Sequence, residues 1–288
     1  MFVRHLNCGT LRPPGGKLVS GSGSPARGAT TFGAARMVCH CLLIETEQGL
    51  VLVDTGIGSA DVRAGSATLG RAWVSLIRPD LVPAETAASQ VVRLGYRVED
   101  VRHVVLTHLD LDHAGGLADF PHAQVHVHET EHAAATRPGK VENARYRADH
   151  WKHRPNWALH RSGGGENWFG FQAVRDLPGL PPEILLVPLS GHSRGHAGVA
   201  VRTDDGWLLH AGDAFFSQRQ LDPAKPSAPP LLRAFENIMQ FDGSARRENQ
   251  RRLRDLVRSR GDELEIFSSH DAVEFDRHAE RAHSGPPV

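Results

Sequence analysis

The sequence contains few cysteines, few aromatic residues, no excess of charge of either sign and no long hydrophobic run. Three cysteines in 288 residues are an odd number in a long chain, which argues against a disulfide-stabilised scaffold. Because side chains alternate along a strand, Cys39 and Cys41 share a face. We expect both to lie in the core as small apolar side chains, and not as metal ligands.

The charges balance, with 33 Lys and Arg residues against 33 Asp and Glu residues. This balance argues against a dedicated nucleic-acid binder but leaves open a local basic patch around Arg246 to Arg260. The expected partner is a small-molecule substrate. Residues 1–5 lack the apolar segment of a signal peptide, and no run approaches the roughly 18 apolar residues of a membrane span. The expectations are a cytoplasmic protein without membrane contact, a monomer or homodimer, and a single domain over residues 1–288.

Four side chains that can bind a metal fall within six positions, directly after the apolar run at 104–106. His108, Asp110 and Asp112 alternate, so an extended backbone places them on one side, and His113 leads into a glycine-rich turn and a short helix. Imidazole and carboxylate together suit a divalent transition metal, and four such groups indicate two ions. The alternative is a solvated polar loop, since the chain has 18 histidines to distribute.

The same pattern of a strand, a break of small residues and then His or Asp recurs along the chain. It appears at Gly191-His192, at Gly212-Asp213 and at Ser269-His270. Several strand ends that meet at one edge would bring these side chains together. Other polar residues near strand ends are expected to support the site without binding metal; they are Asp54, His126, His128, His196 and His210, with His126 and His128 at the surface or beside the ligands.

Hydrophobic patterns predict the regular elements. Strands are expected at 37–44, 50–53, 104–106, 123–128, 184–188, 199–201, 207–210 and 264–268, and helices at 84–94, 129–136 and 244–260, the last capped by Ser244. Glycine- and proline-rich stretches within residues 1–35, including 21–24, predict a loop over the site. The periodic signal fades at about 137–182, which predicts a loop-rich aromatic insert that either lines a substrate pocket or only packs onto the domain.

The order and spacing of these motifs resemble the metallo-β-lactamase superfamily. That family carries His-x-His-x-Asp-His, a later Gly-His, a Gly-Asp and a terminal His, after an early Asp-Thr-Gly. The matching positions run from Asp54 to His270 and cover most of the chain. The resemblance implies an α/β (α+β) fold, an αββα four-layer sandwich of two mixed sheets flanked by helices.

The resemblance also implies the ligand set. One ion would be held by His108, Asp110 and His192, a second by Asp112, His113 and His270, and Asp213 would bridge the two. Zinc is the usual metal in the family, and iron or manganese occurs in some members. The second motif position is normally His. The oxygen ligand at position 110 either shifts the preference somewhat toward iron or manganese or leaves that site weak or empty.

The function implied is hydrolysis of a small ester, lactone or thioester by a hydroxide that bridges two metal ions, with Asp112 orienting the water or shuttling its proton. The layout is most similar to the homoserine-lactone lactonases, which place a Tyr shortly after the Gly-Asp. Here that stretch contains Phe216, so Tyr146 is the candidate replacement, and Trp168 is a further substrate-binding candidate. Two alternatives remain, a di-iron redox or oxygen-handling protein and a metal-containing ligand-binding protein without efficient turnover.

Overall fold

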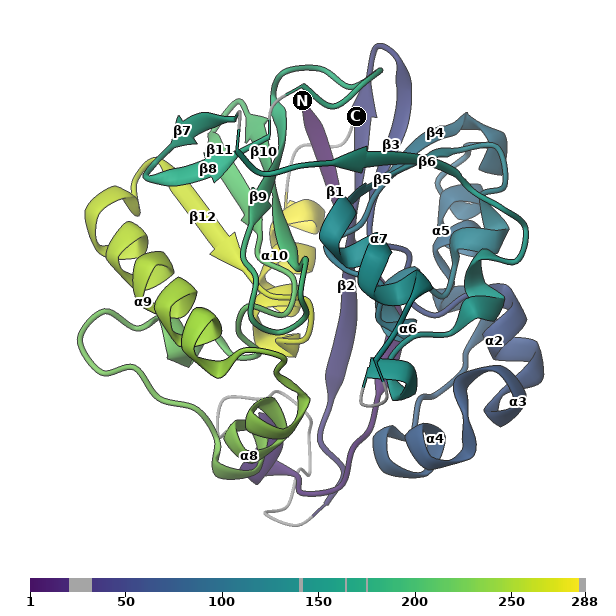
Figure 1. Cartoon of the computed structure of the whole chain (residues 1–288), viewed down its shortest axis with the longest axis horizontal. Coiled ribbons are helices and arrows are strands. Elements are labelled where there is room, and N and C mark those ends of the chain that lie inside the picture. Colours follow the sequence, from purple (N-terminus) through teal and green to yellow (C-terminus); the bar gives the residue numbers. More distant parts are fainter. Residues whose placement is uncertain (21–32, 140–141, 164, 175, 285–288) are drawn as a thin grey trace.

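Two β-sheets face each other at the centre of the molecule, and helices cover their outer sides (Figure 1). The computed structural model describes residues 1–20, 33–139, 142–163, 165–174 and 176–284, so the loop predicted at 21–24 lies outside the described residues. The first sheet has the order β1-β2-β3-β4-β5-β6 and the second β12-β11-β10-β9, with a separate β7-β8 pair. Both large sheets mix parallel and antiparallel neighbours. The αββα sandwich predicted from the sequence is confirmed.

The strands are β1 Phe2–Leu11, β2 Met37–Thr46, β3 Gly49–Val53, β4 Val101–Val105, β5 Gln124–His128, β6 Asn156–His160, β7 Glu166–Trp168, β8 Phe171–Ala173, β9 Ile184–Pro188, β10 Ala197–Thr203, β11 Gly206–His210 and β12 Leu264–Phe267. The α-helices are α1 Lys17–Ser20, α2 Ser59–Ala64, α3 Ser66–Leu69, α4 Arg71–Ile77, α5 Ala87–Arg93, α6 Leu111–Ala114, α7 Glu129–Thr136, α8 Pro230–Met239, α9 Gly243–Arg260 and α10 Ala272–Ser284. Short 3-10 turns are η1 Pro83–Glu85, η2 Val98–Asp100, η3 Leu117–Asp119, η4 Glu142–Ala144, η5 Ala148–Trp151 and η6 Gln218–Leu221. Within the described residues, no helix is both long and apolar enough to cross a membrane.

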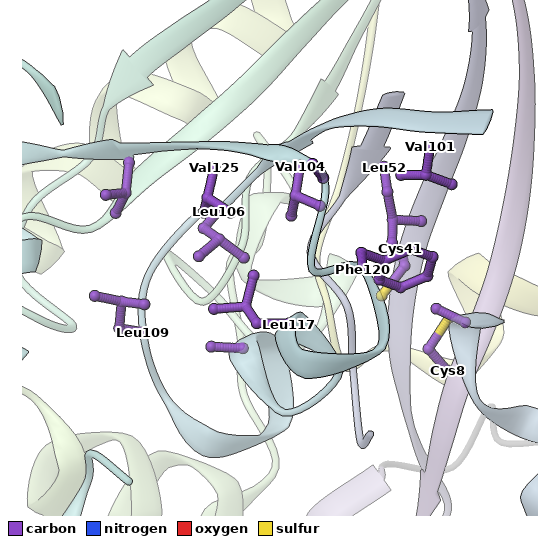
Figure 2. Close-up of a cluster of buried hydrophobic side chains, with 14 of the residues drawn as sticks. Cys8, Cys41, Leu52, Val101, Val104, Leu106, Leu109, Leu117, Phe120 and Val125 are labelled. Carbon is purple, nitrogen blue, oxygen red and sulfur yellow. The ribbon is translucent and has the colours of Figure 1, made fainter. Parts of the chain in front are cut away.

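Three layers of apolar side chains hold the sandwich together. Between the sheets, side chains such as Ile44, Val53 and Val199 pack against one another. On the outer side of the first sheet, a second cluster runs from the strands to the segments that cover them, and Figure 2 shows part of it. On the outer side of the second sheet, α9 contributes Leu253 and Leu256. Central strands buried on both faces explain why β2 is apolar almost throughout.

The cysteine prediction is confirmed, because Cys8, Cys39 and Cys41 are buried free thiols. Two details of the predicted elements are wrong. The long helix α9 begins at Gly243, and its cap is Asp242, whose carboxylate accepts the amides of Ser244 and Ala245 at 2.8 and 3.0 Å. The predicted helix at 84–94 is shorter, because Thr86 caps α5 and the preceding residues form η1.

The segment at 137–182 contains more regular structure than the sequence predicts. Its strand β6 pairs in parallel with β5 and forms an edge of the first sheet (Figure 1). Strands β7 and β8 form an antiparallel pair that extends toward β9 through a bridge between Val174 and Leu186. The periodic signal is weak in β6 because much of this edge strand is partly or fully exposed.

His126 and His128 are buried, so the prediction that they lie at the surface is wrong. Instead, His126 joins a row of histidines: its ring nitrogens lie 3.0 Å from His103 Nδ1 and 3.0 Å from His160 Nε2. Burial, followed by the two neighbouring imidazoles, lowers the pKa of His126 to about 3. These rings are neutral in the folded chain because their environment opposes a positive charge.

This row predicts acid sensitivity. Below the unfolded pKa of about 6.5, the unfolded chain binds a proton at position 126 that the folded chain excludes, so the free energy of unfolding falls as the pH decreases. Replacing His126→Gln keeps a donor and an acceptor without titration. Between about pH 7.5 and about pH 5, the wild type should lose about 2 kcal/mol more stability than this variant. Denaturant unfolding at both pH values measures the difference; the exposed His122→Gln variant is the control, and equal losses in all three proteins would contradict the explanation.

Candidate metal centre

The seven predicted ligands lie together at the ends of four strands. The loop after β4 and helix α6 carry four of them, and the loops after β9, β11 and β12 carry one each. They form three overlapping groups whose ligand atoms lie within 4.8 Å of one another: His108, Asp110 and His192; His108, His113 and Asp213; and Asp112, His113 and His270. Both sheets therefore contribute to one centre, as the recurring motif predicts.

Asp213 lies between the two predicted halves of the centre. Its Oδ1 atom is 3.4 Å from His113 Nε2 and 3.3 Å from His270 Nε2. Its Oδ2 atom is 3.5 Å from His192 Nε2 and 3.8 Å from His108 Nε2. This position agrees with the bridging role that the family resemblance implies for this carboxylate.

The imidazoles are oriented by hydrogen bonds at their far nitrogens. His113 Nδ1 donates to Asp54 Oδ2 at 2.8 Å, and His270 Nδ1 donates to the Val38 carbonyl at 2.8 Å. His108 Nδ1 donates to the Thr107 hydroxyl at 3.0 Å. Each of these rings therefore turns its Nε2 lone pair toward the centre, which is the arrangement that metal-binding histidines need.

The donor set fits a divalent cation. His108 Nε2, His113 Nε2 and Asp213 Oδ1 are buried and have no hydrogen-bond partner among the described residues. Buried polar atoms without a partner are unfavourable and uncommon in folded proteins. A cation among these nitrogen and oxygen atoms would satisfy all three.

The electrostatics of the centre also favour a cation. Burial would lower the pKa of His113, but Asp213 and Asp54 raise it well above its usual value. Burial would likewise lower the pKa of His270, and Asp213 again raises it. The carboxylates therefore favour positive charge at both rings, which a bound metal ion would supply.

Asp54 has the structural role predicted from the sequence. Its carboxylate accepts the Thr107 amide at 2.8 Å and the Thr107 hydroxyl at 2.7 Å, in addition to the His113 ring. Asp54 thereby orients His113 directly and His108 through Thr107. Its backbone is left-handed, with φ at 56°, a conformation that Asp and Asn tolerate better than most residues.

His196 and His210 support the loops, as predicted. His196 Nδ1 donates to the Leu189 carbonyl at 2.9 Å, and its Nε2 accepts the Asp213 amide at 2.8 Å. His210 Nε2 donates to the His40 carbonyl at 2.6 Å. His196 thus joins the Gly-His loop to the Gly-Asp loop, and His210 joins β11 of the second sheet to β2 of the first.

Sequence reasoning missed Glu131, a fully buried residue of α7. Its Oε1 atom accepts the Leu109 amide at 3.1 Å, and its Oε2 atom accepts the Ser193 hydroxyl at 2.7 Å and the Gly195 amide at 3.0 Å. One carboxylate thus joins two ligand loops that are far apart in the sequence. An acidic residue in the first turn of a helix is so common that the sequence offers no signal for this role.

Arg145, in the segment at 137–182, was also missed. Its Nε and Nη2 atoms donate to the two oxygens of Asp110 at 2.8 and 2.6 Å, and Nη2 also contacts His192 Nε2. Burial would raise the pKa of Asp110, but Arg145 holds it well below its usual value. Burial and then Arg145 lower the pKa of His192 to about 4. A single arginine in an irregular stretch has no sequence pattern that identifies it.

Of the three aromatic candidates for substrate binding, only Phe216 lines the cavity beside the centre. Its ring stacks on His270, with centroids 5.1 Å apart. The roles predicted for Tyr146 and Trp168 are not supported by their positions. The Tyr146 hydroxyl donates to Glu131, and Trp168 packs against Trp207 over the second sheet. Both rings stabilise the domain and lie outside the cavity lining.

The contacts of Asp54 predict its effect on metal affinity. The Asp54→Asn variant keeps a side chain that tolerates the left-handed backbone but cannot accept all three hydrogen bonds. The zinc dissociation constant, measured by competition with a chelator, should rise by about 10- to 100-fold. Asp119→Asn makes the same chemical change at a residue that binds only the Ser59 amide, and should leave the affinity unchanged. Equal affinities in both variants would contradict this role of Asp54.

The chain is similar in sequence to known hydrolases. The chain is 42% identical over 271 residues to a probable metallo-hydrolase of Mycobacterium tuberculosis, and the match covers 93% of this chain and 80% of the relative. It is 25% identical over 234 residues to an N-acyl homoserine lactonase of Bacillus cereus, covering 80% of each.

A solved structure of an N-acyl homoserine lactone hydrolase, with N-hexanoyl-L-homoserine bound at its catalytic metal centre, has the same fold. The TM-score is 0.69 at 22% sequence identity, covering 99% of this chain and 96% of the other. The family description "Metallo-beta-lactamase superfamily" matches residues 35–258, which is more than half of the chain. This protein therefore belongs to the metallo-beta-lactamase superfamily, and it is a hydrolase.

Proposed function

We propose that this chain is a metal-dependent hydrolase that cleaves a small ester, lactone or thioester carrying an apolar chain. The observation that carries the proposal is an apolar cavity of about 310 Å³ that opens directly onto the carboxylate and imidazole centre. Sites of a few hundred Å³ with apolar walls and a few convergent polar groups are typical of small-molecule pockets.

The cavity has two chemically different ends. At one end, Asp112, Asp213 and His270 face it from the centre. Asp110, Arg145 and His192 line the same end. The other walls come mostly from the end of β1, from α4 and from α8 and are apolar; they include Leu11, Trp73, Ile77, Leu232 and Phe235. A substrate with a polar, hydrolysable group and an apolar chain would match both ends. The two N-acyl homoserine lactone enzymes above act on a substrate with this division, which supports the same class here.

Different residues of the chain would have different roles in the hydrolysis. A divalent cation held by Asp112, His113, His270 and Asp213 would supply Lewis-acid chemistry, acidifying a water molecule and polarising the substrate carbonyl. Asp112 faces the cavity, with 15% of its side chain exposed, and is placed to orient that water and take its proton. Phe216 holds the His270 ring by stacking and excludes solvent from its cavity side.

The half of the centre that contains His113 offers the ligands for such a cation. A second ion at His108, Asp110 and His192, as in the dinuclear site predicted from the sequence, would require Arg145 to leave Asp110. The preference for iron or manganese that an oxygen ligand at position 110 would create is reduced as well, because Arg145 already engages both of its oxygens.

Removing Asp112 or His113 tests the reaction. The Asp112→Ala and His113→Ala variants should remain folded by circular dichroism and lose at least about 100-fold in kcat on acyl lactones, aryl esters or thioesters. The control is Asp149→Ala, which removes an exposed carboxylate. Full activity in either site variant would exclude the proposed centre. Wild-type protein that contains metal but hydrolyses no member of the panel would exclude the hydrolase proposal for these substrates.

Shortening a cavity wall tests the substrate class. Phe235 lines the cavity and packs edge-on against Phe216, with ring centroids 5.9 Å apart. Phe235→Ala should lower kcat/KM by about 10-fold or more for long-chain substrates, because the chain loses apolar contact, and change short-chain substrates little. Phe241→Ala removes an exposed ring outside the cavity and is the control. Loss of activity that does not depend on chain length would contradict an apolar-chain subsite.

A further inference from the structure

Arg145 occupies the side of the centre where the family pattern implies a metal ion. All five N–H donors of its guanidinium have acceptors. Nε binds Asp110 Oδ1 at 2.8 Å, and Nη2 binds Asp110 Oδ2 at 2.6 Å and contacts His192 Nε2. Nη1 binds the His192 carbonyl at 3.0 Å and the Met239 carbonyl at 2.5 Å. Only 9% of the Arg145 side chain is exposed, so these contacts are buried.

These contacts use the electron pairs that a metal ion would need. His192 Nε2 lies against Arg145 Nη2 and 3.1 Å from Asp110 Oδ2, and both oxygens of Asp110 accept from the guanidinium. Arginine remains protonated in proteins, so its charge cannot be removed to make room for a cation. Asp110 and His192, two of the three ligands predicted for the ion on this side, are therefore already in contact with a permanent cation.

The other half of the centre, which contains His113, has ligand atoms that Arg145 does not contact. His113 Nε2 and Asp213 Oδ1, which are buried and have no hydrogen-bond partner among the described residues, belong to it, together with His108 Nε2 at its border; in the Arg145 half, His192 lacks a partner at Nδ1. The charges agree with this division. Arg145 balances the negative charge of Asp110 but not the charges of Asp112 and Asp213. Two carboxylates match the charge of one divalent ion.

We propose that Arg145 takes the place of one of the two metal ions, so that the chain binds a single divalent ion held by Asp112, His113, Asp213 and His270. The guanidinium then supplies the fixed positive charge on the Asp110 side of the cavity. This inference rests on the proposed metal-dependent function. Counting ions separates the two proposals, because a chain that binds one ion and hydrolyses nothing would contradict only the hydrolase.

The test is the number of zinc ions bound per chain. Metal-free wild type, titrated with zinc in a calorimeter and analysed for metal after gel filtration, should bind about one ion per chain. The Asp110→His/Arg145→Met double variant restores the family's imidazole and removes the charge, and should bind about two. Arg194→Met removes a neighbouring arginine that pairs with Glu142 and touches no ligand, and should still bind about one.

The wild-type count needs no variant, so it decides the matter even where a variant fails to fold. Two ions of similar affinity in the wild type would overturn the inference. A folded double variant that still binds one ion would also overturn it, because Arg145 would then not be the group that excludes the second. One ion in the wild type and two in the double variant would establish that the guanidinium replaces a metal.

Discussion

The structure depends on keeping several carboxylates buried side by side at the ends of strands from two sheets. Burying a charge is strongly unfavourable unless it is paired and hydrogen-bonded. Asp54 is compensated by an amide, a hydroxyl and His113, and Asp110 by Arg145. Asp213 is compensated only by imidazoles, which leaves negative charge for a cation. The compensating groups come from both sheets. The packing of the two sheets and the pairing of these buried carboxylates therefore depend on each other.

That arrangement makes the centre asymmetric. One half is closed by a guanidinium whose donors are all used, and the other presents buried imidazole and carboxylate atoms without partners. Both halves line the apolar cavity, and Phe216 stacks on His270 of the open half. The reactive group and the apolar chain of a substrate are therefore both accommodated next to the half that can hold a metal ion.

Substrate contacts and metal contacts come from different parts of the chain. The ligands follow core strands, whose positions are determined by the packing between the sheets. The cavity walls come from α4, α8 and the end of β1, which lie at the lower rim of the sandwich in Figure 1. Changes in these rim elements can alter the cavity while the strand ends keep the centre intact, which is how one fold supports different substrates.

The sequence by itself determined the recurring pattern of strand, break and ligand and the supporting role of Asp54, and the resemblance of this pattern to a known family implied the sandwich and the seven ligands. Only the tertiary structure decided what surrounds them. Arg145 meets Asp110 across 35 positions and the Met239 carbonyl across 94, and Glu131 meets Gly195 across 64. Such contacts arise when separate segments pack together, and no periodicity in any one segment records them. For the same reason, the sequence implied two metal ions, whereas the packing of one arginine favours a single ion.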